Sequence, residues 1–322
     1  LEDMATKTLE EFEKGEPAVT ITSMDDDKPL EYLIYPIVPM DMTTFIFGDP
    51  GSGKSQLSTV FTILTSLPWH DNKLHLVPPD KPCKGLILDW ESNEASARRL
   101  LKGFTAGMDL GYNELLYRSC ALPLSDDVES VRAWIEETRA SYIIIDSASM
   151  AAGGDLNHMD TATSYLRALR QLNITSISLA HTSKDRENKS KTILGSVLFE
   201  AGARSVWECR GQEDDDCFDI ALFHRKSNMT KKSQPLGFRI NYTEAGNIIE
   251  WHNPNDVAEF VERMGTSQRA IELLKDGPLP DKQITEALGI TGSNWRVTKS
   301  RLKAKKIITE IKGCNALVTP YL

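Results

Sequence analysis

A glycine-rich octapeptide, GDPGSGKS at positions 48–55, follows the apolar stretch TTFIF and precedes a stretch with helical character. It matches the pattern G-x-x-x-x-G-K-[ST] at every position. The glycines let the backbone curl, so that successive N–H groups and the positive end of the next helix face bound phosphate oxygens. The pattern predicts an ATP site with these contact residues: Gly48, Asp49, Pro50, Gly51, Ser52, Gly53, Lys54, Ser55 and Gln56.

Two residues of this segment have roles in catalysis and metal binding. Lys54 is expected to reach the β- and γ-phosphates as a point charge, and the Ser55 hydroxyl is expected to ligate Mg²⁺. A second metal-binding group is expected from Asp146, which ends the apolar strand YIIID, because a phosphate-bound Mg²⁺ needs a carboxylate on its far side. The cofactors predicted are therefore ATP and Mg²⁺.

The residue that activates the attacking water must come from another strand, because Ser147 rather than a glutamate follows Asp146. The stretch LILDWE at 86–91 is predicted to lie beside the strand that precedes the glycine-rich loop, with its carboxylates at the end where ligands bind. Glu91 is the favoured base. Asp89 and Glu94 are alternatives, and Glu91 could instead cap the helix that starts near Asn93.

His181 ends the strand ITSISLA, where a polar group could sense the γ-phosphate. A solvated histidine at a strand end is the plain alternative. The loop at 183–193 is rich in lysine and arginine, and the loop at 150–160 contains two glycines. Both loops follow strand ends, and the first is a candidate for contact with single-stranded nucleic acid or simply a mobile polar loop.

The segment from about 31 to 250 alternates apolar strands with helical patterns, which predicts an α/β fold with a mostly parallel sheet covered on two faces. We expect a nucleotide-binding domain at 31–252, after an N-terminal arm at 1–30. The expected strands are 43–47, 85–89, 141–146, 174–180, 203–209 and 218–225. The expected helices are 54–66, 94–105, 126–139 and 160–172.

The C-terminal residues 266–322 differ in charge and pattern from the rest. They hold ten Lys or Arg and five Asp or Glu, so their net charge is +5. Because the whole chain carries −9, the remainder carries −14. Three short helical patterns and a strand pair around Gly313 predict a winged helix-turn-helix domain, with Asp281 as a candidate cap of the second helix and Thr291 or Ser293 at the start of the third. Arg296, Lys299, Lys303 and Lys306 fall on one side of the third helix, with Trp295, Val297 and Leu302 facing inward. Two partners are consistent with this domain: duplex DNA, with the third helix in its major groove, and another protein.

Composition bounds the class of protein. The five cysteines have no C-x-x-C spacing, which favours reduced thiols and no zinc site. No run of about 18 apolar residues is present, so no membrane contact is expected. The acidic N-terminus does not resemble a secretory signal, so a cytoplasmic location is expected. The start at Leu1 suggests a fragment or a processed chain.

The order of these parts resembles the RecA-like P-loop ATPases, and more narrowly the plasmid RepA-type hexameric helicases, which are relatives of the DnaB helicases. The resemblance covers residues 40–245 and rests on GDPGSGKS, LDWES, IIIDSAS, LAHTSKD, ILGSVLFEAGARSVWE and FHRKSN, in that order. The sequence departs from the family pattern at Leu194, where an arginine often begins the glycine–serine block.

The resemblance implies roles for residues along the chain. Glu91 would be the base, His181 the sensor, and Arg204 a finger that reaches the nucleotide of a neighbouring subunit, with Lys226 and the adjacent Arg225 near the same phosphates. Arg204 could instead be a structural ion-pair residue. The implied protein is an ATP-hydrolysing DNA helicase, bacterial or encoded by a phage or plasmid, that forms a homo-oligomer, a hexamer by this likeness, and moves on single-stranded DNA. A filament-forming recombinase and an ATP-switched DNA-binding replication factor are the alternatives.

Overall fold

The computed structural model describes residue 20 and residues 29–112, 114–183, 192–195, 197–214, 216–257, 260 and 266–318. By internal contacts the chain divides at residue 31 into an N-terminal and a C-terminal unit. The arm expected at 1–30 therefore lies almost wholly outside the described residues, and so do the basic residues of the loop at 184–191. All elements named below belong to the second unit.

Nine strands of the described residues form one sheet in the order β11-β10-β9-β8-β3-β7-β6-β4-β5. The six from β8 to β5 pair in parallel, as the sequence predicts for an α/β fold. They are β3 (Thr43–Gly48), β4 (Gly85–Asp89), β5 (Leu116–Ser119), β6 (Tyr142–Asp146), β7 (Thr175–His181) and β8 (Ser205–Asp214).

The remaining three strands extend one edge as an antiparallel meander: β9 (Cys217–Ser227), β10 (Leu236–Thr243) and β11 (Gly246–Trp251). The strand expected near 218–225 is β9, which joins the mostly parallel sheet but pairs antiparallel with β8. Only two residues separate β8 from β9, and a parallel partner needs a crossover of a dozen residues or more. A short pair, β1 (Tyr32–Ile34) and β2 (Val38–Pro39), precedes β3.

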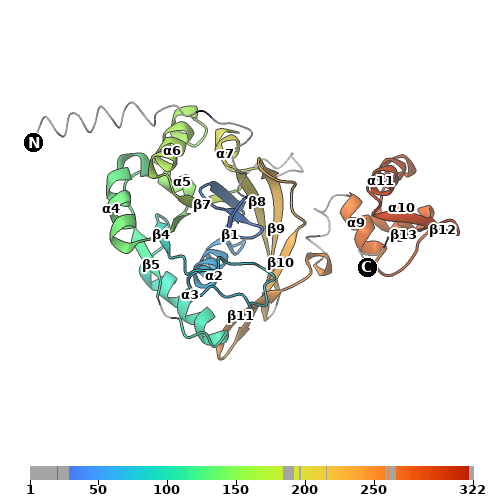
Figure 1. The fold of residues 1–322 in the computed structure, drawn as a ribbon, viewed down its shortest axis with the longest axis horizontal. Coiled ribbons are helices and arrows are strands. Elements are labelled where there is room, and N and C mark those ends of the chain that lie inside the picture. Colours follow the sequence, from blue (N-terminus) through green and yellow to red (C-terminus); the bar gives the residue numbers. More distant parts are fainter. Residues whose placement is uncertain are drawn as a thin grey trace, which may run out of the picture. The chain divides into compact units, whose positions relative to one another are not determined.

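Helices cover both faces of the sheet (Figure 1). One face carries α2 (Lys54–Ser66) and α3 (Glu94–Gly107). The other carries α4 (Val128–Thr138), α5 (Ala148–Ala151), α6 (Met159–Leu172) and α7 (Val197–Gly202). The loop expected at 150–160 is shorter than predicted, because α5 and α6 take both of its ends. None of the described helices is long and apolar enough to cross a membrane.

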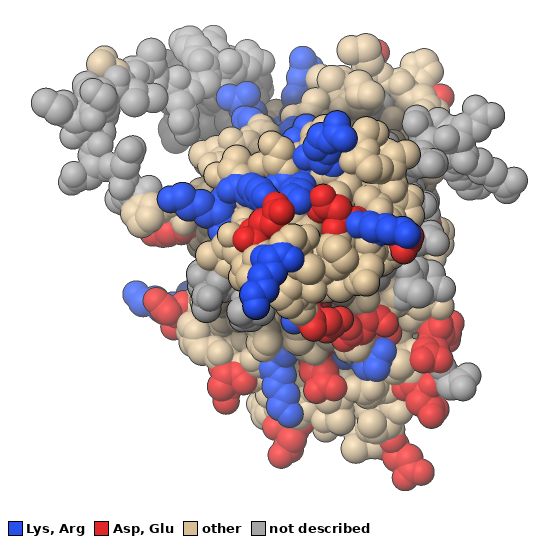
Figure 2. All heavy atoms as spheres, turned by 90° about the vertical axis from the view of Figure 1, so that its right-hand side faces the viewer, with Lys and Arg blue, Asp and Glu red and all other residues tan. Residues whose placement is uncertain are grey.

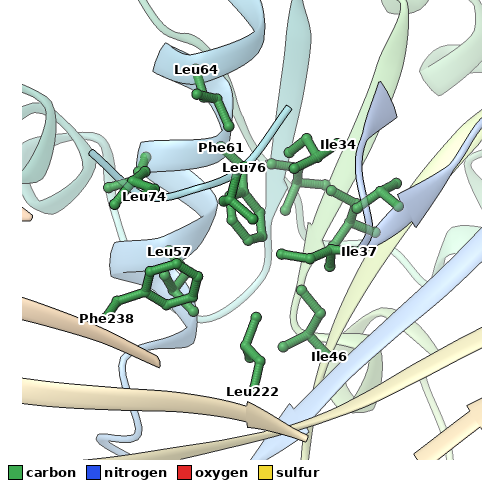
Figure 3. Close-up of a cluster of buried hydrophobic side chains, with 14 of the residues drawn as sticks. Ile34, Ile37, Ile46, Leu57, Phe61, Leu64, Leu74, Leu76, Leu222 and Phe238 are labelled. Atoms are coloured by element: carbon green, nitrogen blue, oxygen red, sulfur yellow. The ribbon is translucent and has the colours of Figure 1, made fainter. Parts of the chain in front are cut away.

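Helix α2 is buried on nearly all sides although it contains many threonines. Its apolar side chains, such as Leu57 and Phe61, meet Ile46 of β3 and Leu222 of β9 in one cluster (Figure 3). The hydroxyls of Thr59, Thr62 and Thr65 bond to carbonyls four residues back, so they need no partner outside the helix. This arrangement lets the helix sit in an apolar layer and holds its N-terminus at the edge of β3.

The C-terminal residues form three helices and a two-stranded antiparallel sheet. These elements are α9 (Thr266–Leu273), α10 (Asp281–Leu288), α11 (Gly292–Ala304), β12 (Ile308–Ile311) and β13 (Cys314–Leu317). They have a hydrophobic cluster of their own, with Trp295 and Leu302 both 2% exposed. Thr291 caps α11 as predicted. Val297, however, is 52% exposed rather than inward-facing, because it comes two residues after buried Trp295 and so lies about 200° around the helix from it.

Asp281 is not the helix cap that the sequence predicts. Pro280 occupies the N-cap position of α10, and the Asp281 carboxylate instead accepts bonds from Trp295 Nε1 at 2.7 Å, Lys299 Nζ at 2.9 Å and Asn315 Nδ2 at 2.7 Å. Burial is the largest single influence and opposes ionisation, but the three donors together outweigh it and lower the pKa of Asp281 to about 2. One carboxylate therefore joins α10, α11 and β13.

We expect Asp281→Asn to loosen the C-terminal elements, because the amide keeps the shape but loses the charge that the three donors share. Hydrogen exchange in the full chain should show faster exchange across 266–318, with the rest unchanged. Asp276→Asn, an exposed change on the same unit, is the control. Because the folded pKa is lowered, the stabilisation is complete above the unfolded pKa and is lost as the pH falls toward 2, so wild type should approach the variant there. Equal protection of wild type and Asp281→Asn at neutral pH would contradict this role.

Candidate nucleotide-binding site

The glycine-rich loop joins β3 to α2 at the carboxyl edge of the sheet. Gly51 and Gly53 have φ values of +77° and +89°, a left-handed conformation that favours glycine. A Cβ atom at Gly53 would also lie 2.5 Å from Ile220 Cδ1 of β9. Both observations explain why the pattern needs glycine here, and the N-terminus of α2 is left open to a phosphate group.

Lys54 is 7% exposed and turned back onto the loop. Its Nζ donates to the carbonyls of Gly48 at 3.0 Å and Asp49 at 2.9 Å. Burial lowers the pKa of Lys54, while nearby Cys209, Asp146 and Glu91 oppose that shift. The ammonium group thus sits at the position where the β- and γ-phosphates are expected.

Ser55 and Asp146 meet at the same edge, with 2.7 Å between Ser55 Oγ and Asp146 Oδ2. Burial is the main cause that raises the pKa of Asp146, and the nearby carboxylates of Asp89 and Glu91 act in the same direction. A hydroxyl and a carboxylate with excess negative charge around them fit a Mg²⁺ ion that also binds phosphates, since Mg²⁺ keeps several water ligands and uses few protein groups. The described residues hold no group of three or more His, Cys, Asp or Glu side chains suited to a metal.

Glu91 lies at this edge although its strand does not adjoin β3. The prediction that 86–91 lies beside that strand is wrong, because β7 and β6 stand between β3 and β4. Parallel strands still bring their carboxyl ends to one edge. Glu91 Oε1 contacts His181 Nε2 at 3.0 Å and accepts a bond from Ser147 Oγ.

The alternatives to Glu91 have other contacts. Asp89 is 5% exposed, and its carboxylate accepts from the backbone N–H groups of Glu91 and Ser92 and from Tyr117 Oη. Glu94 forms an ion pair with Arg98 on α3. The cap of α3 is Asn93, whose side chain accepts from Ser96 N. Of these carboxylates, Glu91 alone contacts His181 among the described residues.

Two residues were missed by sequence reasoning. Ser147 holds Glu91, and Thr182 donates from its hydroxyl to the Asp49 carboxylate in the glycine-rich loop. His181 and Thr182 at the end of β7 therefore contact Glu91 and Asp49 respectively. The available signal was position: both missed residues are hydroxyl side chains that directly follow a residue already placed at the site.

Arg204 lies at the opposite edge of the sheet. It precedes β8, and its backbone N bonds to the carbonyl of Thr43, at the start of β3. At about 3.3 Å per residue, β3 separates this point from Gly48 by roughly 17 Å. The Arg204 side chain is exposed. The structure therefore does not bring Arg204 together with the nucleotide site of the same chain.

Lys226 lies toward that edge, because it pairs with Val206 near the start of β8, and Arg225 is its neighbour in the chain. Arg225 Nε donates to buried Glu208 at 2.7 Å. Lys226 Nζ donates to the carbonyls of Glu200 and Ala203, at 2.6 and 2.9 Å, where α7 ends. Neither residue contacts the glycine-rich loop of its own chain, so their predicted place near phosphates requires a second subunit.

The fold and the site are those of a P-loop ATPase: a mostly parallel sheet with a glycine-rich loop, a serine–aspartate pair and a glutamate at its carboxyl edge. Residues 10–187 match the family AAA_25, described as an AAA domain, and the chain belongs to this family.

Among solved structures, the KaiC-like protein PH0186 from the hyperthermophilic archaeon Pyrococcus horikoshii OT3 is similar to this chain. It has 15% identity and a TM-score of 0.49 over 70% of this chain and 100% of the other. No curated protein matches the chain.

We expect Lys54→Ala to lower the affinity for ATP·Mg²⁺ by about 100-fold or more, because a buried ammonium group is removed from the phosphate site. Isothermal titration calorimetry measures this, with a circular dichroism spectrum to show that the fold is kept. Lys73→Ala, on the connection between α2 and β4, is the matched control. Unchanged ATP affinity in Lys54→Ala would contradict the assignment of this loop.

Proposed function

We propose that the chain is an ATP-driven DNA motor, a ring-forming helicase that moves on single-stranded DNA. The observation that carries the hydrolytic part is the contact of Glu91 with His181 and Ser147 at the edge that also holds Lys54, Ser55 and Asp146. A protein that only binds ATP has no need of a positioned carboxylate beside the phosphate site.

The chemistry follows from these positions. Glu91 accepts a proton from water as the water oxygen attacks the γ-phosphorus and the bond to the β-γ bridging oxygen breaks, which yields ADP and phosphate. Lys54 holds the β- and γ-phosphates, while Ser55 and Asp146 would hold Mg²⁺. When bound, Mg²⁺ neutralises charge on these phosphates. His181 would exchange its contact with Glu91 for one with the γ-phosphate, and so report the nucleotide state to the loop that follows β7.

Assembly enters through Arg204. An arginine finger stabilises charge on the transferred phosphoryl group, but Arg204 lies roughly one strand length from its own site. In a head-to-tail ring the amino edge of one sheet would meet the carboxyl edge of the next, and Arg204 with Arg225 and Lys226 would complete the neighbour's site. A hexamer is the ring that the likeness to RepA-type helicases favours.

DNA contacts are proposed for the loops after β6 and β7 and for the C-terminal elements, read as a winged helix-turn-helix. In the C-terminal elements, two lysines of α11 are already paired with carboxylates: Lys299 with Asp281 at 2.9 Å, and Lys303 with Glu310 at 2.7 Å. The positive charge of this face of α11 is therefore partly neutralised. Figure 2 shows these elements with acidic side chains among the Lys and Arg side chains. Arg296 and Lys306 are exposed, so phosphate contacts to duplex DNA would start from them.

Two other functions remain as outcomes of the test: a filament-forming recombinase, and a replication or regulatory factor that uses ATP as an assembly switch and unwinds nothing. The ATP-switched factor would need tight binding of duplex DNA to α11. The partly neutralised face of α11 does not favour such binding. The motor is therefore the function we favour.

We expect single-stranded DNA to stimulate ATP hydrolysis by the wild type, and a forked duplex to be unwound only with ATP. Glu91→Gln should bind ATP normally and hydrolyse it about 100-fold or more slowly, since general-base catalysis contributes about that much. Glu94→Gln, three residues away on α3, is the matched control. Colorimetric phosphate release and a fluorescent strand-displacement assay measure the two activities.

Three results would count against parts of this proposal. Normal hydrolysis by Glu91→Gln would remove the base assignment. Hydrolysis that ignores DNA, with no strand displacement, would favour the ATP-switched factor. Strand exchange between homologous DNA molecules without unwinding of a fork would favour the recombinase.

A further inference from the structure

A cavity of about 190 Å³ opens beside the glycine-rich loop. Residues Asp49–Ser52 form one wall, the segment Arg210–Gln212 of β8 forms another, and Phe260 contributes a third side. A single water needs about 10–15 Å³ of such space, so the cavity is large enough for a ring system. None of the hydrolytic groups described above, Glu91, His181 and Asp146, lines it.

The strand order tells which end of a bound nucleotide the cavity faces. Glu91, His181 and Asp146 belong to or follow β4, β7 and β6, which all lie on one side of β3. The γ-phosphate must point to that side. On the other side of β3 lies β8, which supplies Arg210, Gly211 and Gln212. An elongated nucleotide held at the loop would therefore direct its sugar and base toward β8.

The distance between β8 and the loop is small because glycine occupies position 211. A Cβ atom there would lie 2.9 Å from Ser52 Cα and would collide with the Phe218 ring. Cys209 Sγ also donates to the Ser52 carbonyl at 3.1 Å. The wall at Arg210–Gln212 is thus fixed against the loop and does not depend on a flexible side chain for its position.

The walls suit a planar base with polar edges. Phe260, 2% exposed, and Pro50 offer apolar ring surfaces. Gln212 carries an amide with both a donor and an acceptor. The Arg210 guanidinium is held by an ion pair with buried Glu208, while part of its side chain stays exposed where Arg210 lines the cavity. A guanidinium carries several N–H donors in a fixed plane, so it suits a ring nitrogen or carbonyl oxygen of a ligand.

We propose that this cavity binds the base of the nucleoside triphosphate, with Gln212 and Arg210 as the groups that read its polar edge. The proposal rests on the proposed ATPase function and adds the residues that distinguish one nucleobase from another. A second place for the base exists on the α2 face of the sheet, where Tyr242 Oη accepts from Gln56 Nε2 at 3.0 Å and Tyr242 is 43% exposed. The test separates the two places.

The experiment compares the affinity of the full chain for ATP·Mg²⁺, GTP·Mg²⁺ and inorganic tripolyphosphate·Mg²⁺ by isothermal titration calorimetry. Wild type should bind ATP more tightly than tripolyphosphate, because only ATP can use the cavity. Gln212→Ala should lower ATP affinity by about 5- to 10-fold, the usual effect of one hydrogen bond, and leave tripolyphosphate affinity within about twofold. The ratio of ATP to GTP affinity should also change. Gln171→Ala, at the exposed end of α6, is the matched control.

Arg210→Lys provides a second variant that keeps a cation beside Glu208 but removes the planar set of N–H donors, and it should lower ATP affinity without changing that for tripolyphosphate. Unchanged ATP affinity in both variants, with Tyr242→Ala erasing the advantage of ATP over tripolyphosphate, would overturn the proposal and place the base beside α2. Equal loss of ATP and tripolyphosphate in Gln212→Ala would also overturn it. If wild type binds neither ligand, the phosphate site itself fails, which is a failure of the proposed function.

Discussion

The parallel pairing of β3 with its two neighbours determines where every group of the site lies. Gly48 is in register with His181 of β7 and with Cys209 of β8, so the glycine-rich loop, the histidine and the end of β8 share one edge. The same register sets Thr44 opposite Ser205 and leaves Arg204 at the other edge. The phosphate-binding end and the arginine of one chain are thus held apart by a rigid strand, and no side-chain rotation closes that distance.

The carboxyl edge concentrates negative charge that the fold does not neutralise by itself. Burial raises the pKa of Asp146, and the nearby carboxylates of Asp89 and Glu91 act in the same direction, while the Ser55 hydrogen bond and the charge of Lys54 oppose the shift. Such an arrangement is costly without a ligand and becomes favourable when a metal–phosphate group arrives. Without a ligand, hydrogen bonds from Ser55 to Asp146, from Ser147 to Glu91 and from Thr182 to Asp49 hold the carboxylates of this edge in place.

Sequence alone predicted the parts that depend on local chemistry. The loop at 48–55, the strand ending at Asp146 and the α/β class follow from glycine spacing and apolar runs, and the structure has all three. The order of the strands could not be predicted, because the sequence of an apolar strand that is buried on both faces does not indicate which strands lie beside it. For this reason β4 was wrongly predicted to lie beside β3. The edge strands β10 and β11 and the short β5 were missed, since half-exposed strands give weaker patterns. Lys299 looked like a free basic residue because its partner Asp281 lies 18 positions away.

We propose that Arg204 of a neighbouring chain completes each site, and a mixture of two inactive variants probes this arrangement. Lys54→Ala supplies an intact Arg204 and a damaged phosphate site, whereas Arg204→Ala supplies the reverse. In a random one-to-one mixture, about one head-to-tail interface in four joins an intact site to an intact arginine. We expect each variant alone to hydrolyse little ATP and the mixture to recover about a quarter of the wild-type rate. Full activity of Arg204→Ala alone, or a mixture as inactive as its parts at concentrations where chains assemble, would contradict it.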